Sequence, residues 1–297
     1  MEKPRTDVRD GFLAALIAYL IWGFLPVYFK TVGSVDALEV LTHRVIWAIP
    51  FGALILTARR QWPEIRRALT HHAMLGWLAV AALFIALNWF IYIWAIHDER
   101  IFETSLGYYI NPLTNMLVGV IYFGERLRRP QLVAVVLAAA GVIVLTASAG
   151  RVPWVALSLA LTFTVYATIR KKVVIGGMPG LFIETSLLLP FALAWLSWLV
   201  VNNSAAIGGG DFTLTFWLVM AGPITALPLL MFTLAARRLP LTTIGFMQFL
   251  APTLQFGTGV YYGEVLTTAH MICFACIWIA VVVFSLDAFR SGRRAPV

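Results

Sequence analysis

The stretch SLGYYINPLTNMLVGVIYFGE, residues 105–125, recurs near the other end of the chain as TIGFMQFLAPTLQFGTGVYYGE, residues 243–264. Both segments are apolar, long enough to cross a membrane as a helix, and interrupted by a proline. The matching positions are 138 to 140 residues apart and comprise Gly107 and Gly245, Pro112 and Pro252, Asn115 and Gln255, Gly119 and Gly259, and Gly124-Glu125 and Gly263-Glu264. Agreement at so many positions indicates an internal duplication.

The polar side chains of each copy fall on one face of a helix. They are Tyr108, Asn111 and Asn115 in the first copy, and Gln248 and Gln255 in the second. Spacings of three, four or seven residues place side chains above one another. Pro112 and Pro252 each remove an amide donor, which predicts a break in both helices. Matched proline-interrupted segments point to a substrate site, although amides could also join neighbouring helices.

Composition identifies the class of protein. Hydrophobic residues make up 61% of the chain and charged residues 12%, against roughly 45–50% and ~25% in soluble domains. This predicts an all-α integral membrane protein. The net charge of +8 does not indicate nucleic acid, because the basic residues occupy short loops. Cys273 and Cys276 lie three apart in one apolar segment, which favours packing over redox or metal chemistry. We therefore expect no metal and no cofactor.

Ten segments have the length and apolarity of membrane spans, which require about 20 residues. They are 11–29, 37–58, 73–96, 102–123, 131–149, 153–170, 180–200, 212–236, 241–262 and 268–289. The first follows a basic N-terminus without a clear cleavage site, so we expect it to be retained. The connections are short, and the longest polar linkers are 59–72 and 201–211.

The distribution of basic residues predicts the orientation. Alternate loops and termini hold 18 Lys and Arg residues, whereas the opposite set holds only Lys30, Arg100 and Arg151. The positive-inside rule then places both termini in the cytoplasm. An offset of about 140 residues covers five spans, and an odd number inverts the second copy. The sequence thus predicts ten helices in an inverted five-plus-five arrangement, with halves 1–149 and 150–297 in one membrane domain.

Ionisable groups inside the apolar segments are candidates for function because they are costly in lipid. The second span carries Glu39, His43 and Arg44, and the seventh carries Glu184 at the position that matches Arg44. Because the spans are inverted, we estimate a vertical gap on the order of 15 Å between Arg44 and Glu184, so we expect no direct contact.

Partners for these groups can be predicted from their depth. Arg44 is expected to be held by Glu39, Asp36 or freed carbonyls, and Glu184 by Lys171, Lys172 or a polar neighbour. Asn88 is a lone amide near the middle of the third span, where it could line a cavity or join two helices. If Arg44 faces a substrate route, its guanidinium favours an anionic or zwitterionic small molecule. The nearly apolar spans 131–149 and 268–289 are expected to serve as scaffold or as homodimer contacts.

Several segments resemble the RarD family of EamA-type drug/metabolite transporters, whose name is associated with chloramphenicol sensitivity. They are AYLIWGFLPVYFK (18–30), EVLTHRVIW (39–47), SLGYYINPL (105–113), GERLRR (124–129), RKK (170–172) with IET (183–185), and LTTIGFMQFLAPT (241–253). The resemblance covers nearly the whole chain. It implies ten helices in the bacterial inner membrane and alternating-access movement of a small molecule, with export as the expected direction. The family motif includes Glu39, His43, Arg44, Asn111, Pro112, Glu184, Gln248 and Pro252.

Two other function classes fit the sequence less well than a transporter. An intramembrane enzyme would need a recognisable catalytic set, and the sequence shows no paired intramembrane aspartates, no GxSxG-like serine and no HExxH. A receptor or scaffold would not need two matched interrupted helices. The absence of a Walker motif excludes ATP as the direct energy source. Proton coupling or exchange stays open, with Glu39, His43 and Glu184 as the groups that could titrate.

Overall fold

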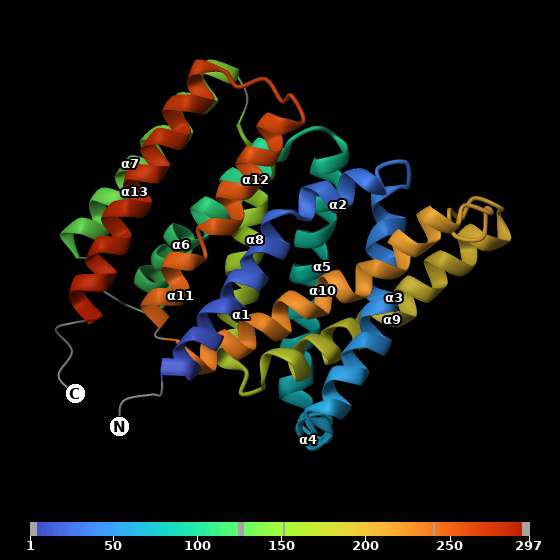
Figure 1. Ribbon diagram of the computed structural model, residues 1–297. Helices are drawn as coiled ribbons and strands as arrows, with labels where there is room; N and C mark the ends of the chain where they lie inside the picture. The colour runs from blue at the N-terminus through green and yellow to red at the C-terminus, as the bar shows by residue number, and fades with distance from the viewer. Residues whose placement is uncertain (1–4, 124–127, 151, 240, 293–297) are drawn as a thin grey trace.

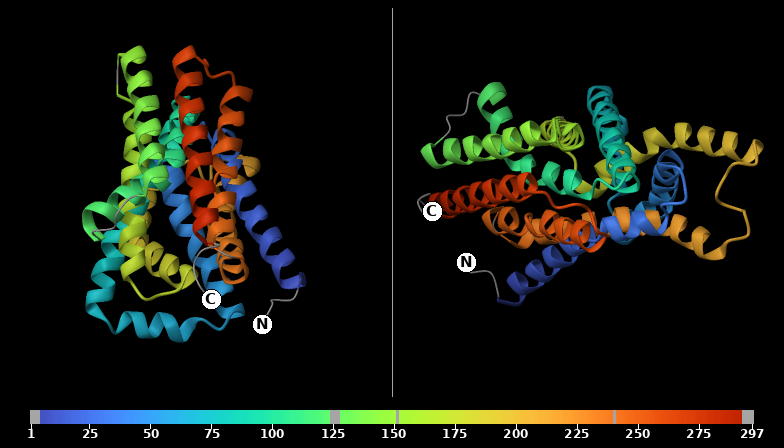
Figure 2. Two further views of the ribbon diagram at one scale, coloured as in Figure 1. Left: turned by 90° about the vertical axis from the view of Figure 1, so that its left-hand side faces the viewer. Right: turned by 90° about the horizontal axis from the view of Figure 1, so that it is seen from above.

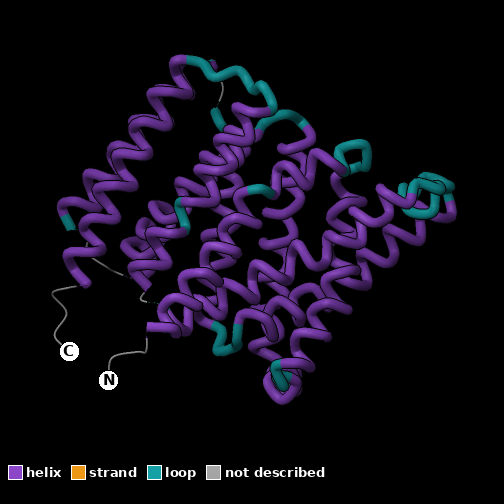
Figure 3. Tube along the Cα trace, viewed as in Figure 1, coloured by secondary structure: helices purple, strands orange, loops and turns teal. Residues whose placement is uncertain are grey.

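The computed structural model describes residues 5–123, 128–150, 152–239 and 241–292, and helices are the only regular elements in these ranges (Figure 3). The helices are α1 (Arg5–Gly23), α2 (Leu25–Thr31), α3 (Ala37–Ala58), α4 (Trp62–Leu69), α5 (His72–His97), α6 (Ile101–Phe123), α7 (Arg129–Ala149), α8 (Trp154–Lys172), α9 (Gly177–Val201), α10 (Phe212–Arg238), α11 (Leu241–Met247), α12 (Leu250–Tyr261) and α13 (Thr268–Gly292). The all-α prediction is confirmed.

Each of the ten apolar segments predicted from the sequence is helical. Within the described residues, six helices are long and apolar enough to cross a membrane by themselves, namely α3, α5, α7, α9, α10 and α13. The α1–α2 pair, bent by 41°, forms a seventh candidate. The remaining apolar segments contain α6, α8 and the α11–α12 pair. The protein is therefore a multi-pass membrane protein.

One expected linker contains a helix. Residues 59–72 include α4, which begins with Trp62 and Pro63 at its first positions and buries Ile65 and Ala68. The chain reaches α4 through Arg60, which has a positive φ of 54°. Proline fits the first turn of a helix because its missing N–H has no intrahelical partner there. Glu64 of α4 accepts a hydrogen bond from the Gly176 amide at 2.6 Å, and this bond joins α4 to the α8–α9 turn.

The two copies of the repeated segment differ in their helical continuity. Pro112 lies inside the continuous helix α6, so the predicted break at Pro112 is wrong. The second copy is divided, because α11 ends at Met247 and α12 begins at Leu250, two residues before Pro252. A further division at Phe24 separates α1 from α2, and Pro26 lies in the first turn of α2.

Helix packing places the repeated segments side by side. Helix α12 packs along α6, α6 packs on α8, and α3 packs against α9 and α10. Helices α7 and α13 form a pair at one edge of the molecule (Figures 1 and 2). Their close approach depends on Gly141, because a Cβ atom there would lie 3.0 Å from the Cys273 carbonyl oxygen. The contact joins α7 to α13, and the expected role of the pair as scaffold or as homodimer contacts stays a prediction.

Helices α3 and α10 also approach closely, and this contact positions the side chains described below. A Cβ atom at Gly222 of α10 would lie 2.3 Å from the carbonyl oxygen of Trp47 in α3. Only glycine therefore fits at this crossing without movement of the backbone. One turn further along α10, Thr225 faces Arg44 of α3.

Candidate functional site

Arg44 lies inside the helix bundle on α3, and only 7% of its surface is exposed. Its Nε donates a 2.8 Å hydrogen bond to Oγ1 of Thr225. The guanidinium carbon lies 4.0 Å from the centre of the Trp89 ring and 5.9 Å from that of Phe29. A cation over an aromatic face at this distance is attracted by the ring quadrupole.

The predicted carboxylate lock on Arg44 is wrong. Asp36 accepts from the Leu38 amide at 2.8 Å and so caps the N-terminus of α3. Glu39 accepts from the Ala206 amide at 2.6 Å in the α9–α10 loop. Among the described residues, no carboxylate oxygen lies within 4.0 Å of the Arg44 guanidinium nitrogens. The cation is therefore stabilised by a hydroxyl group and aromatic rings rather than by an opposite charge.

Tyrosines complete the surroundings of Arg44. Tyr28 and Tyr92 pack on the Phe29 ring beside Arg44, with ring centres 5.0 Å and 5.8 Å from that of Phe29. The rings of Tyr92 and Tyr108 lie 5.5 Å apart, centre to centre. We define the Arg44 site as Arg44, Trp89, Tyr92, Tyr108 and Thr225, which α3, α5, α6 and α10 contribute.

Asn88 connects the Arg44 site to α8. Its Nδ2 donates to the Leu159 carbonyl at 3.0 Å and to the Thr162 hydroxyl at 2.8 Å. Its Oδ1 accepts a 3.3 Å hydrogen bond from the Tyr108 hydroxyl. Asn88 thus joins α5 to α8 and to Tyr108 of α6, which agrees with the interpretation that it links helices, and its role in lining a cavity stays a prediction.

The other amides of the repeated segments have separate environments. Asn111 is buried, and its Oδ1 has no hydrogen-bond partner in the part of the chain that the structure describes. Asn115 is exposed, and Gln248 is half-buried in the turn between α11 and α12. Gln255 is buried and donates through Nε2 to the Trp22 carbonyl at 3.0 Å. Convergence of these amides with Tyr108 on one polar space therefore stays a prediction.

His43 and Glu39 form a pair toward the start of α3. The Nε2 of His43 lies 3.7 Å from Oε1 of Glu39, one helical turn away. Both side chains are buried. The Glu39 bond to Ala206 ties α3 to the α9–α10 loop, so this pair anchors the two halves at one end of the bundle.

Glu184 is held by a separate cluster on α8. Its Oε1 lies 3.5 Å from Arg170 Nε, and its Oε2 accepts a 3.2 Å hydrogen bond from the Tyr166 hydroxyl. Arg170 also donates to the Gly176 carbonyl at 3.1 Å. Among the described residues no ion pair joins Glu184 to Arg44, in agreement with the prediction of no direct contact, and the expected polar neighbour is Tyr166. The basic partner of Glu184 in this cluster is Arg170, a residue that the sequence does not predict for this role.

The sequence does not predict the contacts of Arg44 with Trp89 and Thr225. Trp89 follows Asn88 directly, but aromatic residues are common in membrane helices, so its type gave no signal. Thr225 is 181 residues away from Arg44 in the chain. The proximity of Gly222 is a signal that could have been used, since glycine marks close helix crossings.

Comparison with known proteins identifies the family. The EamA-like transporter family matches residues 9–147. A protein named RarD from Salmonella typhimurium is 43% identical over 295 residues, covering 99% of this chain and 100% of the relative. A transporter from Vibrio cholerae is also 43% identical, covering 99% of this chain and 98% of its own.

A solved crystal structure shares the fold. It has a TM-score of 0.60 at 20% sequence identity, and the alignment covers 94% of this chain and 98% of that structure. The matching family is one of transporters and the Vibrio cholerae relative is named as a transporter, so the protein is a transporter and not an enzyme. The chain therefore belongs to the RarD branch of the EamA-like transporter family.

Proposed function

We propose that this transporter moves a small anionic or zwitterionic molecule across the bacterial inner membrane by alternating access, with export as the direction. The two inverted halves are residues 1–149 and 150–297, each with five spans. The repeated sequence pattern supports this arrangement, as do the helices that occupy all ten apolar segments. The substrate binds where α3, α5, α6 and α10 meet.

The observation that carries the proposal is that Arg44 is buried without a carboxylate partner among the described residues. A buried charge is normally paired, because transfer from water into a low-dielectric interior is costly. Arg44 has no carboxylate within 4.0 Å among the described residues, and only its Nε is engaged, by Thr225. The guanidinium therefore retains donors for a bidentate bond to a carboxylate or phosphate. Trp89 and Tyr108 offer apolar and hydroxyl contacts for the rest of such a molecule.

Substitution of Arg44 tests the proposal. Purified protein in liposomes would be assayed for exchange of radiolabelled carboxylates, amino acids and phosphorylated compounds, with lipophilic cations as a comparison set. We expect Arg44→Gln to reduce transport of the anions by about 10- to 100-fold, the cost of losing a charge-assisted hydrogen bond. Arg44→Lys should also reduce it, because an ammonium group cannot form the bidentate fork.

A control variant separates this role from a structural one. Arg66→Gln alters an exposed arginine of α4 and should leave transport unchanged. If Arg44 only stabilises the fold, both Arg44 variants will lower the amount of folded protein in proportion to activity. Full anion transport by Arg44→Lys and Arg44→Gln would contradict the proposal.

The proposed topology has its own test. With both termini in the cytoplasm, Asn203 lies outside and Arg66 inside. Both residues are exposed in the structure. Cysteines introduced at these two positions should react with an impermeant reagent from opposite sides of the membrane, and labelling from the same side would exclude the ten-span arrangement.

A further inference from the structure

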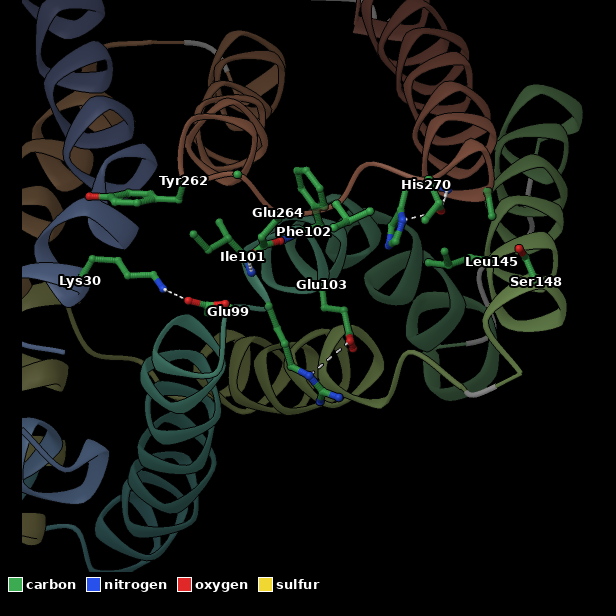
Figure 4. A pocket seen from close by; sticks show the side chains of 15 residues that line it. Lys30, Glu99, Ile101, Phe102, Glu103, Leu145, Ser148, Tyr262, Glu264 and His270 are labelled. Carbon is green, nitrogen blue, oxygen red and sulfur yellow. Dashed lines mark hydrogen bonds and ion pairs between the residues drawn. The ribbon is translucent and has the colours of Figure 1, made fainter. Parts of the chain in front are cut away.

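A carboxylate from the second half caps the first helix turn of α6. Glu264, in the loop after α12, accepts hydrogen bonds from the backbone amides of Ile101 and Phe102, the latter at 2.8 Å (Figure 4). Amides at the start of a helix have no intrahelical partner, and the helix dipole favours a negative charge there. We call this arrangement the Glu264 latch. It joins segments more than 160 residues apart, at the end of the repeated Gly-Glu motif.

A cavity of about 490 Å³ lies over the latch. The side chains around it include Lys30, Glu103, Tyr262, Glu264 and His270 (Figure 4). They come from α2, α6, the α12–α13 loop and α13, so both halves of the protein form its wall. The orientation predicted from the basic residues places this cavity on the outer side of the membrane.

Buried side chains fill the space between this cavity and the Arg44 site. Ile101 lines the cavity and is fully buried in one cluster with Phe29 and Tyr92. The rings of Phe29 and Tyr92 lie 5.8 Å apart, and the Phe29 ring lies 5.9 Å from the Arg44 guanidinium carbon. We call Phe29 and Ile101, which lie outside the Arg44 site as defined above, the outer seal. Because the Ile101 amide is bonded to Glu264, the latch holds one member of this seal in place.

Below the latch, α6 and α12 are joined along their outer portions. The Ser105 hydroxyl donates to the Pro252 carbonyl at 2.7 Å, and the hydroxyls of Tyr109 and Thr253 are 2.6 Å apart. Helix α11, which precedes α12, packs instead on α1, α10 and α13. The two copies of the repeat therefore meet closely at the end that carries the latch.

From this geometry we infer that Glu264 is the outer gate of the transport route, and that the cavity above it is the vestibule into which the route opens. This inference rests on the proposed alternating access. With the latch formed, the outer seal separates the Arg44 site from the outside. When the carboxylate leaves the two amides, the start of α6 is free to move away from α12, and the vestibule connects to the Arg44 site.

Thiol accessibility tests the gate without any substrate. The native thiols would be removed by Cys273→Ala and Cys276→Ala, and Ser105→Cys would supply a reporter below the latch, where Ser105 is fully buried. An impermeant maleimide would be added to the outside of spheroplasts. We expect Glu264→Gln to speed labelling of the reporter by about tenfold or more, because the neutral amide loses the charge-assisted bonds.

A neighbouring carboxylate provides the matched control. Glu99 lines the same cavity and pairs with Lys30 at 3.9 Å, but its side chain is 82% exposed and it does not bond the amides of α6. Glu99→Gln should therefore leave the labelling rate unchanged. Glu264→Asp, which keeps the charge but shortens the reach, should give an intermediate rate and serves if Glu264→Gln folds poorly.

The outcomes are distinct from those of the transport assay. Equal labelling rates with Glu264 and with Glu264→Gln, in protein that elutes as a folded monodisperse species, would show that Glu264 is only a static helix cap. The same acceleration by Glu99→Gln would also contradict the gate. Either result can occur whatever the Arg44 variants do in the transport assay. Conversely, a transport result that contradicts the Arg44 proposal would not change the labelling rates.

Discussion

Helix α6 and the α11–α12 pair descend from one repeated sequence pattern but have different structures. Helix α6 continues through Pro112, whereas the second copy is divided before Pro252. The equivalent amides differ as well, since Asn115 is exposed and Gln255 is buried against α1. The shared pattern predicted equal roles for the two copies, and the structure assigns them separate ones.

The cause lies in the helices that pack on each copy. Pro26 of α2 has no amide hydrogen, so the Trp22 carbonyl four residues earlier lacks its usual helical donor. Gln255 supplies that donor at 3.0 Å. At the offset of 140 residues, the position equivalent to Pro26 is Tyr166, inside the continuous helix α8. Helix α8 therefore offers Asn115 no equivalent freed carbonyl, and no hydrogen bond of the Asn115 side chain is found among the described residues.

This difference bears on transport. In the alternating-access arrangement that we propose, the two inverted halves must differ from each other in any single state, because one side of the membrane is closed while the other is open. The close contact between α6 and α12 near the Glu264 latch, together with the separate packing of α11, is what such a state requires. The comparison can be tested by substitutions that affect only one copy.

The largest effect is expected at Gly259. A Cβ atom there would lie 2.8 Å from two ring carbons of Phe102, which is the residue whose amide bonds Glu264. Gly259→Ala should therefore push α12 away from α6 and destabilise the fold by about 1–3 kcal/mol, the usual cost of overpacking. Thermal unfolding of purified protein in detergent would measure it.

Gly257 gives a matched control on the same helix. A Cβ atom at Gly257 meets no atom within 4 Å, and Gly257→Ala should be neutral or slightly stabilising because alanine favours the helix. Equal unfolding temperatures for the two variants would show that α6 and α12 are not in tight contact at this point.

The fold was largely predictable from the sequence because the length of an apolar run sets the length of a membrane helix. The expected span 73–96 is α5, His72–His97, and the expected span 212–236 is α10, Phe212–Arg238. Helix α4 was missed because an eight-residue segment with two arginines has neither the length nor the apolarity of a span. Only one face of α4, with Ile65 and Ala68, is buried, and it is buried because the helix bundle lies beside it.

The site was predictable only in part. Arg44 is evident as a charge within an apolar run, and Tyr108 as part of the repeated pattern. Their partners are set by the way helices cross, and periodicity within one helix cannot show which residue of another helix lies opposite. The Trp89 ring beneath Arg44 and the Trp22 carbonyl beside Gln255 are both of this kind.

A smaller effect is expected at Gln255, and it separates the two amides of the repeat. Gln255→Met keeps the volume of the side chain but leaves the Trp22 carbonyl without its donor. One buried neutral hydrogen bond is worth about 1 kcal/mol, so the variant should unfold at a lower temperature and should loosen the packing of α12 on α1. Asn115→Ala, on an exposed position, should change stability by less than about 0.5 kcal/mol.

Transport activity should be affected in the opposite order, more strongly by Asn115→Ala than by Gln255→Met. If Asn115 is free to meet the substrate, Asn115→Ala lowers transport at unchanged stability, whereas Gln255→Met lowers transport only as far as it lowers the amount of folded protein. The measurement is the exchange rate in liposomes divided by the quantity of folded transporter. Equal losses of stability in both variants would mean that the two copies of the repeat have the same structural role after all.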